Sequence, residues 1–378
     1  MTLYANSRLP ANRNSGYDLA KIARGLLSAA GTRTNGEKMT EHYSGRRVIV
    51  TGGLGFIGSN LVLRLVELGA EVTVIDGLIH GCGGNEWNLD TVRARITVIR
   101  ADLLHSEMYE PALAGVDFVF NLAGEISHIQ SMRDPERDLR LNALSQLRFL
   151  TTLARVKPGA QVIYAGTRQV CGRPRYLPVD EEHPIEPVDF NGIHKRAAEH
   201  YHLLMSRDGM IDATVVRLTN VYGPRLALGV PGQGFIPAFL ARALNGQGLE
   251  VYGDGRQLRD PVYVDDVVEA FLRIGVLTRR EPRLYHLGGP AALSLHEIAR
   301  LISRAAGLGG EVSLRPFPAE HLKFDIGSYT TNSARLREAL GWQPRVSFAE
   351  GIQRTIEFFL QHRQHYLRAP ARDPVPAA

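Results

Sequence analysis

Three glycines in one short run constrain the fold more than any other feature of the chain. The run is Val48-Ile49-Val50-Thr51-Gly52-Gly53-Leu54-Gly55-Phe56-Ile57-Gly58. It begins with four β-branched residues and continues with glycines spaced three apart, at 52, 55 and 58. Glycines at a strand-to-helix turn allow a tight turn, a close approach of backbone to a pyrophosphate and close helix packing. The N-terminus of the following helix favours an anion. The run therefore predicts the first βα unit of a dinucleotide-binding fold.

An acidic residue at the end of the next apolar segment supports a dinucleotide ligand. Asp76 closes the segment 71–76 and lies 18 residues after Gly58. A carboxylate at this place accepts hydrogen bonds from the adenosine ribose and repels a 2′-phosphate. The position predicts NAD as the cofactor, in preference to NADP.

Short apolar segments alternate with amphipathic stretches over the first half of the chain. This alternation predicts an α/β fold with a doubly wound parallel sheet and helices on both faces. Expected strands are 47–51, 71–76, 96–100, 118–122 and 161–164, and expected helices are 58–68 and 139–154. After about residue 225 the spacing becomes irregular, with Gly/Pro-rich loops between helices at 235–244, 294–306 and 349–360.

These patterns divide the chain into four regions. We expect a disordered extension over 1–44, with one short helix possible at 18–30, and a Rossmann-type NAD-binding domain over 45–225. The sheet of that domain is expected to be completed by later segments at 259–275. A smaller α/β substrate lobe is expected over 226–365, and a disordered tail over 366–378.

The charge balance argues against a nucleic-acid partner. The chain has 44 Lys and Arg against 39 Asp and Glu, and the whole excess lies in residues 1–47.

The two cysteines, Cys82 and Cys171, fit neither a disulfide framework nor a zinc site. We therefore expect no metal site, and we expect the protein in the reducing cytoplasm. No apolar run approaches the ~20 residues of a membrane helix.

Further motifs carry a family resemblance. The Gly-x-x-Gly-x-x-Gly spacing resembles the short-chain dehydrogenase/reductase superfamily. Segments 217–224, 252–260, 263–266 and 340–344 are similar to its extended branch, the nucleotide-sugar epimerases and dehydratases such as UDP-glucose 4-epimerase. The resemblance covers roughly 46–360. It implies tightly bound NAD that oxidises a sugar hydroxyl to a ketone and later returns the hydride, and a homodimer.

The resemblance also implies which residues bind the cofactor and the substrate. The cofactor set is Gly52, Gly55, Phe56, Ile57, Gly58, Asp76, Asp102, Leu103, Leu122, Ala123, Gly124, Asn142, Ala165, Lys195 and Val221. The substrate set is Thr167, Asn220, Phe235 and Arg259. An arginine beside Asp260 in a Gly-rich stretch suits bidentate recognition of a diphosphate.

One catalytic position departs from the family pattern. The family uses a Ser/Thr, and a Tyr and a Lys four residues apart on one helix face. Thr167 and Lys195 fit two of these positions, but the tyrosine position holds Asn191. An amide cannot act as a phenolate base. The chain therefore lacks the residue that the family uses as the base for oxidation at C4.

Three accounts of the missing tyrosine remain open. Glu125, which follows the fourth-strand motif, is the leading replacement base, ahead of His194, His128 and Tyr164. Alternatively, Asn191 and Thr167 only orient the sugar, and the proton moves through water. In the third account the protein binds NAD and a nucleotide sugar without turnover.

The residues after Thr167 help to choose among reactions. Family 4,6-dehydratases carry an Asp-Glu pair there, whereas this chain has Arg168 and Gln169. We therefore expect epimerisation of a nucleotide-diphosphate sugar, with C4 favoured. The enzymatic alternative is an atypical decarboxylase or dehydratase that uses Glu125.

Overall fold

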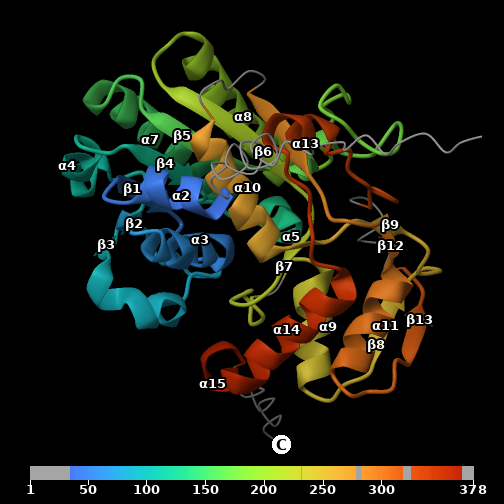
Figure 1. The fold of residues 1–378 in the computed structure, drawn as a ribbon. Coiled ribbons are helices and arrows are strands. Elements are labelled where there is room, and N and C mark those ends of the chain that lie inside the picture. The colour runs from blue at the N-terminus through green and yellow to red at the C-terminus, as the bar shows by residue number, and fades with distance from the viewer. Residues whose placement is uncertain (1–34, 231, 278–282, 318–324, 368–378) are drawn as a thin grey trace, which may run out of the picture.

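A computed structural model describes residues 35–230, 232–277, 283–317 and 325–367 of the chain. Its centre is a seven-stranded parallel sheet in the order β11-β6-β5-β4-β1-β2-β3 (Figure 1). The strands are β1 (Arg47–Thr51), β2 (Glu71–Ile75), β3 (Thr97–Ile99), β4 (Phe118–Asn121), β5 (Gln161–Thr167), β6 (Asp212–Leu218) and β11 (Leu284–Leu287). The expected doubly wound α/β fold is confirmed.

Both faces of the sheet are covered by helices. In β1, Val48 and Val50 belong to one apolar core and Ile49 to another, because successive side chains of a strand point to opposite faces. The first core contains α2 (Asn35–Tyr43), α3 (Phe56–Glu67) and α10 (Val264–Val276). The second contains α4 (Glu110–Leu113), α7 (Ser145–Val156) and the end of α8 (Phe190–Arg207).

The order of the strands determines where a ligand can bind. β1 pairs with β2 on one side and with β4 on the other. Strands β2 and β3 are thus added on one side of β1, and the later strands are added on its other side. In open α/β sheets, ligands bind beyond the carboxyl ends of the strands at such a switch point. The glycine-rich loop lies at this point because it directly follows β1.

A smaller lobe packs around a third core and lies below the sheet in Figure 1. Helices α9 (Phe235–Leu244), α11 (Leu295–Ala305) and α14 (Phe348–Gln361) enclose that core together with the parallel pair β8 (Leu249–Tyr252) and β13 (Val312–Arg315). Ser294 and Glu297 form a capping box that fixes the start of α11.

Short elements join the lobe to the sheet and complete the main domain. They are η1 (Glu86–Arg95), η2 (Ser106–Met108), α5 (His128–Arg133), α6 (Pro135–Leu139), η3 (Arg140–Leu144), η4 (Arg168–Cys171), β7 (Val221–Tyr222), β9 (Leu258–Arg259), β10 (Val262–Tyr263), β12 (Leu293–Ser294), α13 (Ala334–Leu340) and α15 (Arg363–Tyr366). The strands β7 and β10 pair in parallel, and β9 and β12 pair antiparallel.

Two sequence expectations about organisation need correction. Residues 35–43, expected in a disordered extension, form α2, and the Tyr43 hydroxyl donates to the carbonyl of Leu272 in α10 at 2.9 Å. The sheet is completed by β11, whereas 264–276 forms a helix on one face. The possible helix at 18–30 and residues 368–378 of the tail expected over 366–378 lie outside the described residues, and Tyr366 belongs to the last helix, α15.

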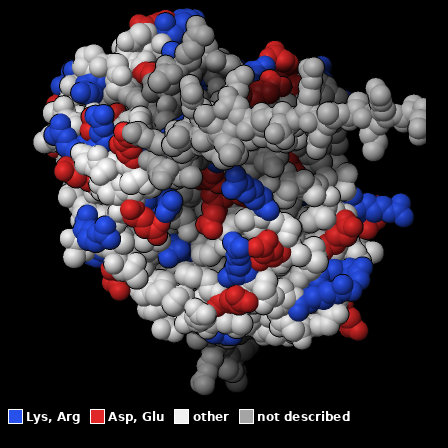
Figure 2. Space-filling model, viewed as in Figure 1, with Lys and Arg blue, Asp and Glu red and all other residues white. Residues whose placement is uncertain are grey.

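The surface mixes charges of both signs. Over the described part of the face in Figure 2, basic side chains alternate with acidic ones, which differs from the continuous basic strip of a nucleic-acid groove. Among the described residues, no helix combines the length and the hydropathy needed to cross a bilayer.

Candidate active site

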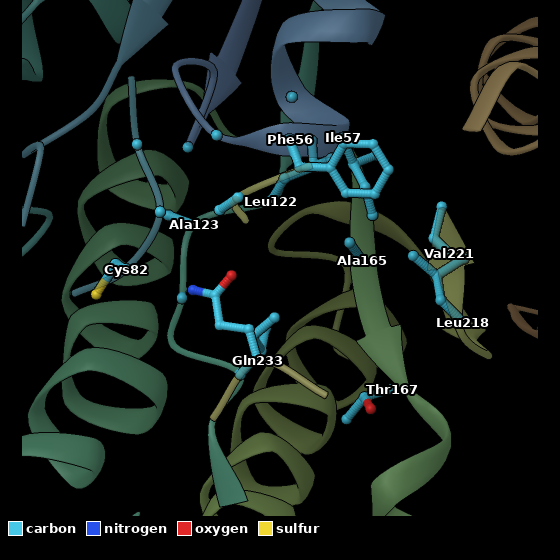
Figure 3. Close-up of a pocket in the computed structure, with 18 of the residues that line it drawn as sticks. Phe56, Ile57, Cys82, Leu122, Ala123, Ala165, Thr167, Leu218, Val221 and Gln233 are labelled. Carbon is cyan, nitrogen blue, oxygen red and sulfur yellow. The ribbon is translucent and has the colours of Figure 1, made fainter. Parts of the chain in front are cut away.

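A single cavity of about 440 Å³ collects most of the predicted site residues. It lies between the carboxyl edge of the sheet and the smaller lobe. Its walls include the glycine-rich loop, Asp76, Thr167, Lys195 and Arg259. Figure 3 shows Phe56 and Ile57 at one end, with Ala165 and Thr167 following one another along β5 away from them. Every predicted cofactor and substrate residue except Asn142 lines this cavity, as do Thr167, Lys195 and Asn191 of the predicted catalytic set.

The glycine-rich loop depends on Gly52 for its backbone angle and on Gly58 for a close contact. Gly52 has a φ of +67°. A Cβ on Gly58 would lie 2.2 Å from the carbonyl oxygen of Gly52, so α3 touches the turn here. The first residues of α3 line the cavity, and a helix N-terminus favours a pyrophosphate. The loop has the shape that a dinucleotide requires.

Asp76 is held at the carboxyl end of β2 by two backbone N–H groups. It accepts hydrogen bonds from Leu54 N at 2.9 Å and from Leu78 N at 2.8 Å. Burial raises the pKa of this carboxyl above its ordinary value, although these hydrogen bonds oppose the change. A carboxylate has about four acceptor positions, so it retains capacity for two ribose hydroxyls.

We expect Asp76→Asn to weaken NAD binding by about 10- to 100-fold, because it removes charge-assisted hydrogen bonds to the ribose. The preference for NAD over NADP should fall with it, since the charge that repels a 2′-phosphate is gone. Titration of both nucleotides by calorimetry measures the ratio, with the exposed Asp90→Asn in η1 as the control. An unchanged ratio of NAD affinity to NADP affinity would show that Asp76 does not bind the ribose.

Lys195 projects a free ammonium group into the cavity. The residue is 7% exposed, and within the described part of the chain Nζ forms no hydrogen bond or ion pair. Burial lowers the pKa of Lys195 to about 8, and the nearby carboxylates of Asp138 and Glu125 only partly oppose this. A Cβ on Gly124 would lie 2.3 Å from Nζ, so the fourth-strand glycine makes room for the ammonium group.

Asn191, at the position of the missing tyrosine, is built into a polar network. Its Nδ2 donates to the carbonyl of Glu125 at 3.1 Å and to Oδ2 of Asp138 at 2.9 Å. His194 lies 2.7 Å from the other oxygen of Asp138 through Nδ1. The Oδ1 atom of Asn191 is buried and has no hydrogen-bond partner among the described residues.

Glu125, expected as the replacement base, has its carboxylate engaged elsewhere. It is 2% exposed, and it accepts hydrogen bonds from Nη1 of Arg137 at 3.0 Å and from the thiol of Cys82 at 3.3 Å. The N–H groups of Ile126 and Ser127 add two more. Glu125 does not line the cavity. Glu125 is connected to the cavity through Cys82 and Asn191, which line it, and its negative charge opposes the lowering of the Lys195 pKa.

The remaining candidate bases are also occupied. His128 lines the cavity, but its Nδ1 contacts Asp189 and its Nε2 lies 2.7 Å from the amide nitrogen of Gln169. Tyr164 is 1% exposed and stacks on His202 in the core, and burial raises its pKa above the ordinary value. Neither side chain offers the cavity an open proton acceptor.

Asp138 is a site residue that the sequence reasoning missed. It is 2% exposed, lies on the short helix α6, and joins Asn191 to His194. An acidic residue inside the run 134–139 gives no signal by itself. The amide of Asn191, at the position where a tyrosine is expected, is the available hint, because a buried amide requires a partner.

Comparison with known proteins agrees with this geometry. The sequence model of the NAD dependent epimerase/dehydratase family matches residues 48–288. The chain belongs to that family. Its cofactor is therefore NAD, as the sequence predicts, and the glycine-rich loop and Asp76 are the parts of this chain that fit it.

Relatives within the epimerase/dehydratase family carry different activities. UDP-glucose 4-epimerase of Mycolicibacterium smegmatis is 32% identical over 326 residues, 84% of this chain and 100% of that protein. UDP-glucuronic acid decarboxylase 1 of Xenopus tropicalis is 31% identical over 326 residues, 85% of this chain and 73% of that protein. A crystal structure of UDP-glucose 4-epimerase from Thermotoga maritima with UDP-glucose superposes with a TM-score of 0.76 at 30% identity, covering 84% and 99% of the two chains.

Proposed function

We propose that the protein modifies a nucleotide-diphosphate sugar through a transient ketone, and that the reaction is epimerisation at C4. The observation that carries the proposal is the single cavity, which joins the dinucleotide loop to Thr167, Lys195 and the arginine of the smaller lobe. A cavity that holds a cofactor and a phosphorylated substrate end to end suits hydride transfer between them. The epimerase and decarboxylase relatives support the same class of substrate.

Thr167, Asn191 and Lys195 handle the reacting hydroxyl in this proposal. Thr167 lies at the end of β5, where its hydroxyl can bind the C4 oxygen. Asn191 offers its unpartnered Oδ1 to the sugar. Lys195 accepts the hydroxyl proton in its neutral form, because a pKa of about 8 makes it an effective base near neutral pH. Glu125 acts as a positioning residue whose charge raises the pKa of Lys195.

The proton and the electrons balance over a complete turnover. NAD, when bound, supplies the acceptor for the hydride from C4 and gives the hydride back. The hydroxyl proton passes to Nζ of Lys195 as the C4–O bond becomes a carbonyl. Rotation of the ketone sugar presents its opposite face, and Lys195 returns the proton to the C4 oxygen as the hydride returns. The epimer leaves, and the enzyme is unchanged.

The other cavity residues bind the nucleotide end of the substrate in this proposal. Arg259 pairs with the diphosphate, while Asn220 and Phe235 line the wall beside it. The Oδ1 atom of Asn220 and the Nε atom of Arg259 are buried without a partner among the described residues. Both atoms are therefore available to a polar ligand.

The proposal is tested by incubating the purified protein with NAD and a panel of UDP, dTDP, GDP and CDP sugars. We expect one sugar to give a product of equal mass and different chromatographic retention. Thr167→Ala, which removes the hydroxyl at the C4 oxygen, should slow this conversion by about 100-fold or more. A product lighter than the substrate by the mass of water or of carbon dioxide would show that the reaction is dehydration or decarboxylation and not epimerisation. NAD binding without any product would favour a binding protein.

We also propose that the protein is a homodimer through α7 and α8. Both helices cover the same face of the sheet, and their outer sides expose Leu147 at 37% and Leu204 at 46%. Apolar side chains gathered on neighbouring helices mark a contact surface.

We also propose that the protein works in the reducing cytoplasm, because Cys82 and Cys171 form no disulfide bond.

We expect Leu147→Glu combined with Leu204→Glu to produce monomers, because charges in an apolar contact surface lose their hydration. Sedimentation equilibrium should give the 41.7 kDa mass of one chain for the variant and about twice this mass for the wild type. The control is Leu360→Glu on α14, at a site that is 58% exposed on the smaller lobe. A monomeric wild type would exclude the interface.

A further inference from the structure

Leu54, in the middle of the glycine-rich loop, is held through both of its backbone polar groups. Its N–H donates to Oδ2 of Asp76 at 2.9 Å. Its carbonyl oxygen accepts from the side-chain amide of Asn88 at 2.9 Å and from the N–H of Asn85 at 3.0 Å. A movement of Leu54 therefore changes the hydrogen bond that holds Asp76, the carboxylate predicted to bind the ribose.

The hydrogen bonds of Asn88 run in one direction only. Asn88 is 2% exposed and belongs to η1. Its amide nitrogen must face Leu54, because a carbonyl oxygen can only accept. Its Oδ1 therefore faces the other way, where the hydroxyl of Tyr366 in α15 donates to it. A chain of three hydrogen bonds thus leads from Tyr366 through Asn88 and Leu54 to Asp76.

Tyr366 belongs to the smaller lobe, at the other end of this chain. It is 8% exposed, and its ring packs against Phe358 and Phe359 of α14. The helix α15 directly follows α14 (Figure 1). Arg363 fixes the start of α15 to the end of α9, since its Nη1 donates to the carbonyl of Leu244 at 2.7 Å. The hydroxyl of Tyr366 is therefore a fixed point of the smaller lobe that reaches the NAD-binding domain.

Separate contacts hold η1 against α15. The ring of Trp87 stacks on that of His365, with 4.1 Å between the centroids and 11° between the planes. The side-chain amide of Asn85 donates to the carbonyl of His365 at 3.1 Å. These contacts do not involve the hydroxyl of Tyr366. Removing that hydroxyl therefore tests the hydrogen bond to Asn88 and leaves the docking of α15 in place.

We propose that Tyr366 and Asn88 are positioning residues that set the selectivity of the cofactor site for NAD over NADP. Neither residue lines the cavity, whose described wall includes Asp76 itself, so each acts through Leu54 on the carboxylate. A carboxylate binds ribose hydroxyls well only when its oxygens are aligned with them, because hydrogen bonds weaken steeply with misalignment. The inference rests on NAD as the cofactor and on the predicted role of Asp76. It does not depend on which sugar reacts.

The test measures the ratio of NAD affinity to NADP affinity by calorimetric titration of two variants. Tyr366→Phe keeps the aromatic ring and removes the hydroxyl. We expect it to lower the ratio by about 3-fold, because Asn88 loses a hydrogen bond that orients it. Asn88→Asp keeps the shape but places a carboxylate oxygen against the carbonyl of Leu54. We expect this variant to lower the ratio by about 10-fold.

Tyr43→Phe is the matched control. It also removes a buried hydroxyl that donates to an acceptor on a distant helix, the carbonyl of Leu272 at 2.9 Å, and it lies outside the cavity. Its ratio should equal that of the wild type. A fall as large as that of Tyr366→Phe would overturn the inference, because a general loss of stability would then explain both results.

The remaining outcomes separate this inference from the role of Asp76. A ratio that falls in Asp76→Asn but stays at the wild-type value in Tyr366→Phe and Asn88→Asp overturns the inference alone. A ratio that is unchanged in Asp76→Asn overturns both. If Asn88→Asp does not fold, the ratio of Tyr366→Phe decides. Each measurement is made without turnover, so the proposed function is tested independently.

Discussion

Lys195→Met is expected to reduce turnover at saturating NAD by about 1,000-fold. The loss follows from the position of Lys195 in the cavity wall, where its Nζ forms no hydrogen bond or ion pair with the described residues, whereas both ring nitrogens of His128 are engaged. General-base catalysis contributes in this range. Steady-state rates with the sugar found in the panel measure the loss. Lys157→Met, at the end of α7 and outside the cavity, is the matched control and should keep full activity.

Lys195→Arg distinguishes a base from a fixed positive charge. A guanidinium keeps the charge but does not lose its proton at accessible pH. We therefore expect Lys195→Arg to be as inactive as Lys195→Met. In the wild type, kcat/KM should rise with pH through about 8 and level off above it, because the neutral amine is the active form. An active Lys195→Arg, or a rate that falls above pH 8, would contradict the role of Lys195 as the base.

The same ionisation gives a stability test that does not depend on turnover. Because burial lowers the pKa of Lys195 to about 8 from 10.5, the unfolded chain binds more protons than the folded protein between these two pH values. The free energy of unfolding should therefore gain a contribution from Lys195 as pH rises through that window, on the order of 3 kcal/mol in total. In Lys195→Met this contribution should be absent. Urea denaturation of both proteins at pH 7.5 and 9.5 measures the difference.

Gly58→Ala is expected to weaken NAD binding by about 100-fold and to destabilise the fold by about 2 kcal/mol. The new Cβ would lie 2.2 Å from the carbonyl oxygen of Gly52 and 2.8 Å from the Cα of Gly53. Both are backbone atoms at the end of β1, so they cannot swing aside as a flexible side chain would. The loop must shift, and the N–H groups that face the pyrophosphate shift with it.

A matched glycine elsewhere controls for the substitution itself. Gly248 lies in the smaller lobe with open space around its Cα, so Gly248→Ala should change neither stability nor NAD affinity. Calorimetric NAD titrations and urea denaturation of both variants make the comparison. Unchanged NAD affinity in Gly58→Ala would mean that the contact between α3 and the turn does not shape the cofactor site.

Local patterns explain why the centre of the fold could be predicted. The β-branched run before Gly52 and the acid at Asp76 each fix structure within a few residues. The helix α2 could not be predicted, because its burial depends on a distant partner: Tyr43 reaches the carbonyl of Leu272 across 229 positions. The last strand, β11, is four residues long and acquires its place from parallel pairing with β6.

The site shows the same division between local and distant information. The sequence alone identifies Thr167 and Lys195 as candidates and predicts that Asn191 stands where the family pattern has a tyrosine. It does not show that Glu125 is engaged by Arg137, because that pairing depends on how the loop after β4 turns back on α6. That the Nη1 atom of Arg168 lacks a hydrogen-bond partner among the described residues is likewise visible only in three dimensions.

The central claim is that one carbon loses a hydride and regains the same hydride on its other face. The most direct test uses two incubations of the nucleotide sugar found in the panel with the protein and NAD. In the first, the sugar carries deuterium at C4 and the solvent is ordinary water. In the second, the sugar is unlabelled and the solvent is heavy water. We expect an isobaric epimer that keeps the C4 deuterium in the first case and takes up no solvent deuterium in the second. Loss of the C4 label to water, solvent deuterium at carbon, or a change of product mass would contradict the account.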